Sequence, residues 1–404
     1  MTRALEGIRV IDLSHVLAAP TTTMFLADLG AEVIHLEPPH GDDAREYGPF
    51  AGEPGKNHSG YFISLNRSKK SMVLNLKLAK GKEILRELIG VSDVIIENFR
   101  PSTMKKMGLG WEEIQKINPR IIYAAISGFG HDSPPEYAAR PSYDMVAQAY
   151  SGLMSITGPV GGPPCRVGSS VGDIIAGQQA AIGILAALAY REKTGRGQFY
   201  DGSMVDGLFT ALESAVARYT ITGKIPGPLG GAHPSITPFE AFRTKDAWII
   251  TAAGNDVLWA KLCRVLGRDD LIHDPRFENN NLRTENQPKL STILTAEFIQ
   301  KTTAEWIGIF EKAEIPYSRI NDIREICEDP VIRHRNMLVT VDQPGVGPVR
   351  IAGSAIRLSE TPGRVETPAP LLGEHSAEVL REILGYTPER IEALKAEGVI
   401  NATV

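Results

Sequence analysis

The feature of this sequence that most restricts its fold is the alternation of short apolar runs with helical patterns near the amino terminus. Residues 8–13 are typical of a buried strand, 22–29 of a helix and 31–36 of a second strand, which is reached through Gly30. The alternation continues with strands expected at 72–76, 94–96 and 121–126, and a helix at 80–89. Such a series predicts an α/β fold in which helices cover a parallel sheet.

Later segments predict further helices and a division into domains. Dense small and apolar residues over 174–191 predict a helix buried on most sides, and 203–222 predict another. A stretch rich in glycine and proline at 223–240 then predicts a linker. We expect residues 1–222 to form the first part of a large domain, 241–320 a smaller domain of strands and helices, and 321–404 a second linker with a carboxyl-terminal segment.

The composition indicates a large buried core and no general affinity for polyanions. Of the 404 residues, 43% are hydrophobic, and the formal net charge is -5, so no broad positive field would attract nucleic acid or anionic lipid. The longest apolar stretch, 180–190, is too short to span a bilayer, and the amino end lacks the apolar run of a secretory signal. We therefore expect a cytoplasmic protein that does not enter a membrane.

Two common kinds of cofactor site are disfavoured by what the sequence lacks. The three cysteines are widely spaced, and no His-Glu-x-x-His or Cys-x-x-Cys motif occurs, so we expect neither a disulfide framework nor a metal. The first strand-to-helix turn, 12–20, contains no glycine, whereas a dinucleotide needs glycines there for the close approach of its pyrophosphate.

Asp173 is the most informative candidate for chemistry. It lies just before the long apolar helix, where unpaired backbone amides and the helix dipole favour an ionised carboxylate. One interpretation is a simple helix N-cap. The other is a nucleophile toward an activated acyl group, because glycines and serines around it leave room for a bulky reactant.

Loops that precede this helix in the sequence suggest what such a reactant contains. Basic residues recur at 66–70, 98–101 and 105–106, where strands are expected to end, and several cations there suit a ligand with phosphates. Each cluster taken alone is also typical of an ordinary solvated loop. The segment 227–235 is either a mobile lid or an inert linker.

Taken together, these residues resemble the class III coenzyme A transferases, the family that includes formyl-CoA and carnitine CoA transferases. The resemblance runs from residue 5 to about residue 384 and includes Asp173 with Gly177. Its other specific motifs are GIRVIDLS at 7–14, LADLGAEVI at 26–34, EPxxGD at 37–42, ENFRP at 97–101, YDxxxQ at 143–148 and RxxTGRGQ at 191–198.

The resemblance implies a fold and a reaction. The implied fold has a Rossmann-like large domain built from both chain ends, a smaller domain between them, and two interlocked subunits. In the implied reaction, Asp173 attacks the donor thioester to form an anhydride, the released thiolate gives an enzyme-bound CoA thioester, and the acceptor acid reverses these steps. Gly230 and Gly231 resemble the glycine loop that shields the anhydride from water.

The resemblance also implies particular contacts with coenzyme A and the acids. The CoA contacts carried over by position are Val16, Ala18, Asn98, Phe99, Arg100, Lys106 and Tyr143, with Arg67 and Lys69 as neighbours. Leu17 replaces a glutamine of formyl-CoA transferase, which argues against a formyl or oxalyl specialist, and Pro38 replaces a cation for which Arg45 is the candidate substitute. His233, Ser235 and Thr237 are candidates for holding a second carboxylate, which favours a dicarboxylic acid with succinyl-CoA as donor.

Two alternatives remain open at this point. An α-methylacyl-CoA racemase shares the fold, but its histidine base falls at Tyr143, and an unperturbed phenol with a pKa near ~10 is a poor base at neutral pH. A non-catalytic partner of a two-chain transferase would have no need for Asp173. We expect acyl-CoA and a carboxylic acid as substrates and a homodimer, with a hetero-oligomer of related chains as the alternative.

Overall fold

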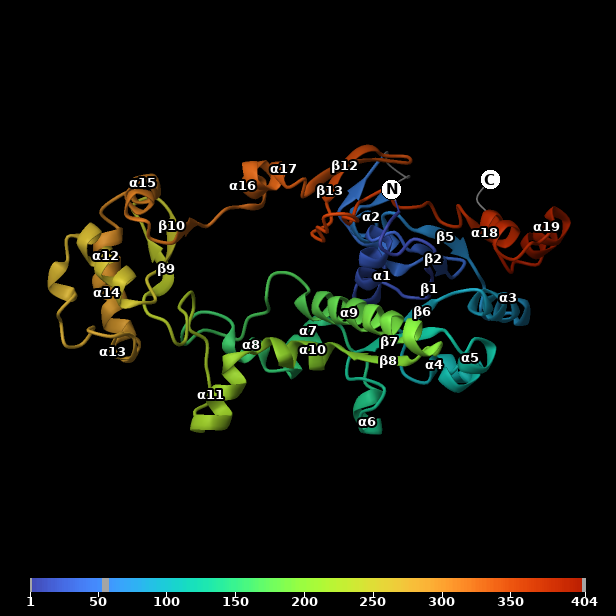
Figure 1. Cartoon of the computed structure of the whole chain (residues 1–404), viewed down its shortest axis with the longest axis horizontal. Helices are drawn as coiled ribbons and strands as arrows, with labels where there is room; N and C mark the ends of the chain where they lie inside the picture. The colour runs from blue at the N-terminus through green and yellow to red at the C-terminus, as the bar shows by residue number, and fades with distance from the viewer. Residues whose placement is uncertain (1, 53–57, 402–404) are drawn as a thin grey trace. The chain divides into compact units, whose positions relative to one another are not determined.

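The computed structural model describes residues 2–52 and 58–401, which form two compact units. The first unit combines Met1–Leu153, Val167–Ala217 and Pro330–Val404, and therefore includes residues near both ends of the chain. The second unit combines Met154–Arg166 and Arg218–Asp329. Each unit is described by itself below (Figure 1).

A six-stranded sheet with only parallel pairs forms the centre of the first unit. Its strand order is β5-β2-β1-β6-β7-β8, and within it Val10 pairs with both Val33 and Val94. The strands are β1 (Arg9–Asp12), β2 (Glu32–Glu37), β5 (Lys70–Val73), β6 (Val94–Glu97), β7 (Ile122–Ser127) and β8 (Phe199–Ser203). The predicted parallel α/β architecture is confirmed, although β8 was not predicted from the sequence.

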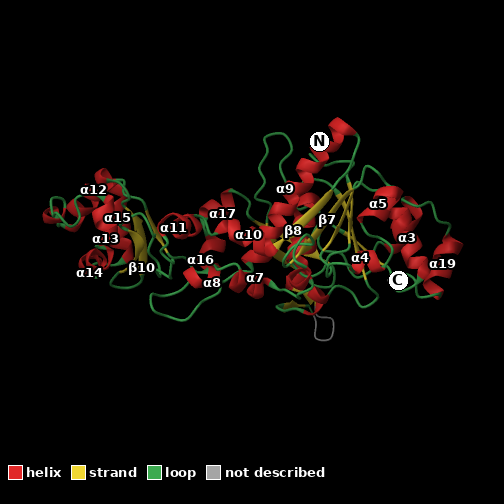
Figure 2. Cartoon of the chain, turned by 90° about the horizontal axis from the view of Figure 1, so that it is seen from below, coloured by secondary structure: helices red, strands yellow, loops and turns green. Residues whose placement is uncertain are grey.

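Two helical layers cover the two faces of this sheet (Figure 2). Val10 and its alternate neighbours pack toward α1 (Ala18–Asp28) and α9 (Val171–Thr194), whereas Ile11 packs toward the opposite layer. This opposite layer contains α3 (Ala79–Gly90), α5 (Trp111–Ile117), α18 (Ser376–Glu382) and α19 (Pro388–Ala396). Because both faces are buried, the strands are apolar at consecutive positions, which is why the sequence shows them as continuous apolar runs.

Helix α9 is the central helix of its layer. By length and composition alone it could cross a membrane, a criterion that core helices also meet, and here its buried side chains pack on α1, β7 and β8. The contact with α1 is close, since a Cβ on Gly177 would lie 2.5 Å from the Ala18 carbonyl oxygen. The helix expected at 203–222 is divided into α10 (Met204–Ala211) and α11 (Ser214–Thr222), because Glu213 takes a left-handed φ of 54°.

Short elements complete the first unit. A hairpin of β12 (Leu338–Gln343) and β13 (Gly347–Ala352) contributes Ile351 to a small core with Phe62 and Ile63. The remaining elements are η1 (Asp43–Glu46), β3 (Phe50–Ala51), β4 (His58–Ser59), α2 (Gly60–Asn66), α4 (Thr103–Lys106), α6 (Pro135–Ala138), α7 (Asp144–Tyr150) and α17 (Pro330–His334). Helix α8 (Leu153–Ile156) lies at the boundary between the units.

The second unit is an antiparallel sheet packed against helices. The sheet order is β11-β10-β9, and a core of aromatic side chains lies beneath it, with Phe242 stacked on Phe298 at 4.4 Å between ring centroids. Its strands are β9 (Phe239–Arg243), β10 (Trp248–Ala252) and β11 (Tyr317–Arg319). Its helices are α12 (Asp256–Leu266), α13 (Asn280–Glu285), α14 (Gln287–Phe298), α15 (Thr303–Ala313) and α16 (Ile323–Glu328), with the 3-10 turn η2 (Asp269–Leu271).

We predict opposite effects of the same substitution at two helical glycines. Gly177→Ala should lower the free energy of unfolding by about 1–3 kcal/mol, because its methyl group would overlap the α1 backbone. Gly308→Ala, in α15 with no atom beyond its own stretch of helix within 4 Å of the new carbon, should raise it by about 0.5–1 kcal/mol. Urea denaturation of both variants would measure the effects, and equal effects would contradict the packing argument.

Candidate active site

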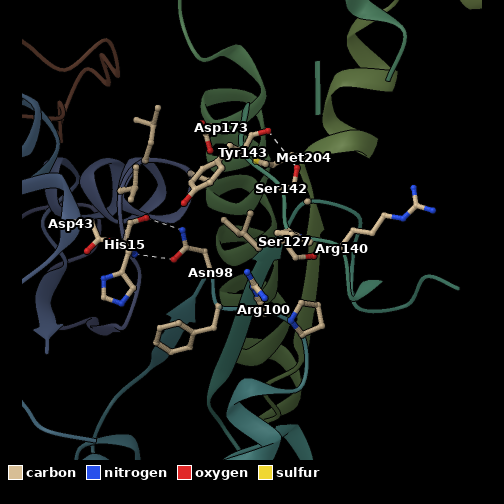
Figure 3. A pocket seen from close by; sticks show the side chains of 18 residues that line it. His15, Asp43, Asn98, Arg100, Ser127, Arg140, Ser142, Tyr143, Asp173 and Met204 are labelled. Atoms are coloured by element: carbon tan, nitrogen blue, oxygen red, sulfur yellow. Dashed lines mark hydrogen bonds between the residues drawn. The ribbon is translucent and has the colours of Figure 1, made fainter. Parts of the chain in front are cut away.

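A cavity of about 260 Å³ lies at the carboxyl edge of the parallel sheet (Figure 3). Its walls come from the loops that follow β1, β6 and β7, together with the start of α9 and of α10. Ligands of open parallel sheets bind at this edge. The lining includes eight of the predicted residues, namely Val16, Leu17, Ala18, Asn98, Phe99, Arg100, Tyr143 and Asp173.

Asp173 is in the first turn of α9, with its side chain in the cavity wall. The N-cap position belongs to Ser170, so the interpretation of Asp173 as an N-cap is wrong. Burial, and then the nearby charge of Asp144, raise the pKa of Asp173 to about 7. The helix dipole alone predicts a lowered pKa, and here the cost of burying the charge outweighs it. A half-buried carboxyl group with this pKa is available to react.

The YDxxxQ motif holds the chain just before Asp173. Asp144 Oδ1 accepts a hydrogen bond from Gly172 N at 2.8 Å, and Gln148 Nε2 donates to Asp144 Oδ2 at 2.7 Å. Gln148 Oε1 in turn accepts from Val167 N at 2.9 Å. This motif therefore fixes the approach to α9, and it also places a second negative charge near Asp173.

The loop after β1 has a strained backbone at Val16. Its φ of 67° is in the left-handed region, which a β-branched residue rarely adopts and which costs about 1–3 kcal/mol. Asn98 binds both backbone polar groups of His15, the residue before Val16. Its side chain accepts from His15 N and donates to His15 O, each at 2.8 Å. Asp42 accepts from Val16 N at 3.1 Å. Side chains from elsewhere in the unit therefore maintain this conformation.

Glu97, the last residue of β6, fixes the loop that follows this strand through a hydrogen bond to its backbone. This buried carboxyl group accepts hydrogen bonds from Phe99 N at 2.6 Å and from Tyr123 Oη at 3.0 Å, and burial raises its pKa to about 7. The Phe99 ring lies 5.6 Å from the His15 ring. Arg100 follows, exposed and without an ion pair among the described residues. Its guanidinium is therefore available to an anionic ligand.

A second cavity of about 540 Å³ shares His15 and Phe99 with the first. Pro38, His40 and Lys77 are among its lining residues. Arg45, the expected substitute for a cation at Pro38, lines neither cavity, because it forms two 2.7 Å hydrogen bonds with Glu37 and lies over the Phe62 ring. Lys77 is the lysine that the structure places in this cavity instead.

Three other predicted CoA contacts lie outside both cavities. Arg67 is buried and pairs with Asp28 at 2.8 and 3.1 Å, and Lys69 is buried against Asp12 at 3.2 Å. Both were predicted to contact coenzyme A, and the structure contradicts this because internal carboxylates already neutralise their charges. Lys106, at the end of α4, is exposed and lines neither cavity.

Gly230, Gly231, His233 and Ser235 belong to the second unit. Gly230 has a φ of 60° and donates to the Gly158 carbonyl at 3.0 Å. His233 stacks on Phe239, and Ser235 Oγ accepts from Arg218 Nη2 at 2.9 Å. Thr237, in contrast, is buried and its hydroxyl accepts from Thr284 at 3.1 Å, so it is not available to a second carboxylate. The roles of the other four stay predictions.

The sequence analysis missed several residues of the first cavity. Ser127 is the last residue of β7, so the rule that ligands bind at strand ends would have found it, whereas Arg140 and Ser142 gave no such signal. The guanidinium of Arg140 extends away from the other labelled side chains (Figure 3). Tyr61 does not line this cavity and gave no signal in the sequence, but burial and then the Asp173 charge raise its pKa to about 12. No group of three or more possible metal ligands occurs in the described ranges.

This fold and site define an α/β protein whose pocket carries a carboxyl group with a raised pKa, and comparison with known proteins specifies the family. The model for CoA-transferase family III matches residues 5–376. The chain therefore belongs to CoA-transferase family III, and the predicted enzyme class is confirmed.

Curated relatives and a solved structure agree with this assignment. Succinyl-CoA:glutarate CoA-transferase of Mus musculus is 41% identical over 98% of this chain and 90% of its own length. Acetyl-CoA:oxalate CoA-transferase of Acetobacter aceti is also 41% identical, over 93% and 95% respectively. A CAIB/BAIF family protein from Brucella suis superposes with a TM-score of 0.84 at 34% identity, over 95% of this chain and 100% of that one.

We predict that Arg67 and Arg100 differ in what they support. Arg67→Met should lower the free energy of unfolding by about 3–5 kcal/mol, because Asp28 would remain buried without a partner, and should leave CoA affinity unchanged. Arg100→Met should weaken CoA binding while changing stability by no more than about 0.5 kcal/mol. Urea denaturation and calorimetric titration with CoA would separate the two, and weaker CoA binding by folded Arg67→Met would restore the original assignment.

Proposed function

We propose that this protein transfers coenzyme A from an acyl-CoA thioester to a dicarboxylic acid, with Asp173 as the residue that carries the acyl group. The observation that carries the proposal is the position of Asp173, in the wall of a cavity at the carboxyl edge of the sheet. Its side chain forms no ion pair and no hydrogen bond within the described part of the chain. A structural carboxylate at such a place would have a partner.

The proposed reaction is covalent and needs no external oxidant or base. An Asp173 oxygen attacks the thioester carbon, the carbon–sulfur bond breaks, and the CoA thiolate leaves a mixed anhydride. The thiolate then attacks the Asp173 carbonyl carbon, which releases the donor acid and leaves an aspartyl-CoA thioester. A carboxylate of the acceptor acid repeats both steps in the opposite direction, giving the new acyl-CoA and free Asp173.

The start of α1 supports this chemistry. The helix begins at Ala18 in the cavity wall, and no side chain caps it, so the amides of Ala18 and Ala19 remain available as hydrogen-bond donors, whereas Pro20 has no N–H. Such amides stabilise the oxyanion that develops when a thioester is attacked. We assign this role to the first turn of α1, and the water-excluding role to Gly230 and Gly231.

The second cavity supports the placement of coenzyme A. Its volume and its position beside the first cavity, with which it shares the lining residues His15 and Phe99, suit the nucleotide end of the molecule, with Lys77 beside the phosphates. Arg100 lines the first cavity, and its cation suits the nearer phosphates. The pantetheine arm then runs past Asn98 and Tyr143 toward Asp173.

The relatives support a dicarboxylic acid as acceptor. The names of those cited above include glutarate and oxalate, and a relative from Haloarcula hispanica, 38% identical over 96% of this chain, is a succinyl-CoA:mesaconate CoA-transferase. All three acids carry two carboxyl groups. We propose succinyl-CoA as the donor, and His233 and Ser235 as groups that hold the second carboxylate.

A homodimer is the proposed assembly. In the first unit, α7 exposes Met145, Val146 and Tyr150, and α9 exposes Ile182. A group of exposed apolar side chains at this density favours a protein partner, and the family resemblance favours an interlocked second copy. Sedimentation equilibrium would test this, since a monomer mass for the active protein would reject the homodimer. Activity that requires a second, related chain would favour the hetero-oligomer.

The function is tested by one substrate panel with a matched variant. Succinyl-CoA is mixed with glutarate, oxalate, mesaconate or acetate, and new CoA esters are separated by chromatography. We expect transfer to the dicarboxylates, and we expect Asp173→Asn to abolish it while melting at the wild-type temperature and still binding CoA. Turnover by Asp173→Asn would remove the nucleophile role, and transfer only to acetate would reject the dicarboxylate.

The pH dependence should report the ionisation of Asp173. Because only the ionised carboxylate attacks, kcat/KM should rise with pH through a midpoint of about 7. Asp144→Asn should lower this midpoint, since it removes the like charge, but only in part, because burial is the larger cause. Asp43→Asn, which changes another acidic residue of the cavity, should leave the midpoint in place. A midpoint unaffected by Asp144→Asn would assign the titration to another group.

A further inference from the structure

A buried row of four charged side chains lies beneath the loop that follows β1. Lys69 Nζ is 3.2 Å from Asp12 Oδ2, His35 Nδ1 is 3.4 Å from the same oxygen, and His35 Nε2 is 3.5 Å from Asp42 Oδ2. All four residues are at most 3% exposed. The signs alternate along the row, and the proposed reaction uses none of these groups.

Asp42 connects this row to the cavity. Its two carboxylate oxygens accept from Val16 N at 3.1 and 3.3 Å, and Oδ1 also accepts from Ala44 N at 2.8 Å. Val16 lines the cavity in its left-handed conformation, which a valine leaves unless it is held. Asp42, at the end of this row, is therefore hydrogen-bonded directly to the strained residue Val16.

His35 faces a carboxylate with each ring nitrogen. To attract both Asp12 and Asp42, both nitrogens must carry a proton, so the ring must be a cation. At 3.4 and 3.5 Å neither contact is a regular hydrogen bond, so the attraction is between charges. Burial by itself lowers the pKa of His35, but the nearby carboxylates, Asp12 first, raise it to about 9. Without this cation, Asp42 would be a buried charge with no ion-pair partner among the described residues, and it would turn away or take up a proton.

We propose that His35 is a positioning residue for acyl transfer: as a buried cation between two carboxylates, it keeps Asp42 on the Val16 amide and so keeps the segment from Val16 to Ala18 in the conformation that lines the cavity opposite Asp173. The proposal rests on the proposed role of Asp173, because it concerns the geometry around that carboxylate. His35 acts through Asp42 and Val16 and does not touch the substrate.

A double-mutant cycle between His35 and Val16 tests this link. His35→Gln should lower kcat by about 10–100-fold with little change in KM, because displacements of about 1 Å at a reacting centre have effects of this size. Glycine adopts a left-handed φ without strain, so in a Val16→Gly background the loss caused by His35→Gln should shrink to a few-fold. Equal fold losses in the two backgrounds would overturn the proposal, as would full turnover by His35→Gln.

Further variants separate positioning from folding. His35→Lys keeps a cation between the carboxylates and should recover most of kcat. His375→Gln is the matched control, because His375 also packs at β5, where it accepts from Ser71 N at 3.3 Å, but lines neither cavity; it should retain wild-type kcat. If His35→Gln does not fold, Asp42→Asn takes its place in the same cycle with the same expected result.

A structural readout makes the test independent of turnover. A crystal structure of His35→Gln should show Val16 at a negative φ, and a retained left-handed Val16 would overturn the proposal. Asp173→Asn is assayed alongside. Activity of Asp173→Asn would reject the proposed function itself, whereas an inactive Asp173→Asn together with an additive cycle would reject the role of His35 alone.

Discussion

The close packing of α9 on α1 is the contact on which the site depends. At Gly177 the two helices approach so closely that no side chain fits between them, and both helices begin at the same cavity. Asp173 is one turn before this contact, and Ala18 is on the other side of it. The distance between the proposed nucleophile and the first amides of α1 is therefore set by helix packing, which is less variable than the conformation of a loop.

The buried carboxyl groups of the first unit differ in pKa because their neighbouring groups differ. Asp42 has a histidine cation beside it, and its pKa is lowered despite the opposing effect of burial. Glu97 receives hydrogen bonds but pairs with no cation among the described residues, and burial raises its pKa. Asp173 has a second carboxylate nearby and no cationic partner in the same described ranges, and its pKa is raised as well. The protein thus keeps its structural carboxylate charged and its proposed nucleophile near the point of titration.

Sequence periodicity was sufficient for five strands of the parallel sheet but missed β8. Strand ends were sufficient for the loop at Asn98, whereas Val16 was predicted only from the family resemblance. The sequence wrongly suggested Arg67 and Lys69 as ligand contacts, because it does not show that Asp28 and Asp12 neutralise these cations inside the protein. The break at Glu213 was missed since its left-handed φ leaves no compositional trace. The raised pKa of Asp173 depends on burial and on Asp144, and both are properties of the folded unit.

The late-synthesised residues that bind the outer edge of β5 affect how the chain folds during translation. The outer edge of this strand bonds to residues more than three hundred positions later, with Val73 N donating to Ser376 Oγ at 3.0 Å and His375 N donating to Ser71 O at 2.9 Å. On the ribosome, a nascent chain that has produced the whole cavity still has an open sheet edge and an uncovered apolar layer. Such an edge can pair with other unfinished chains, so this protein is exposed to misassembly until translation passes α18.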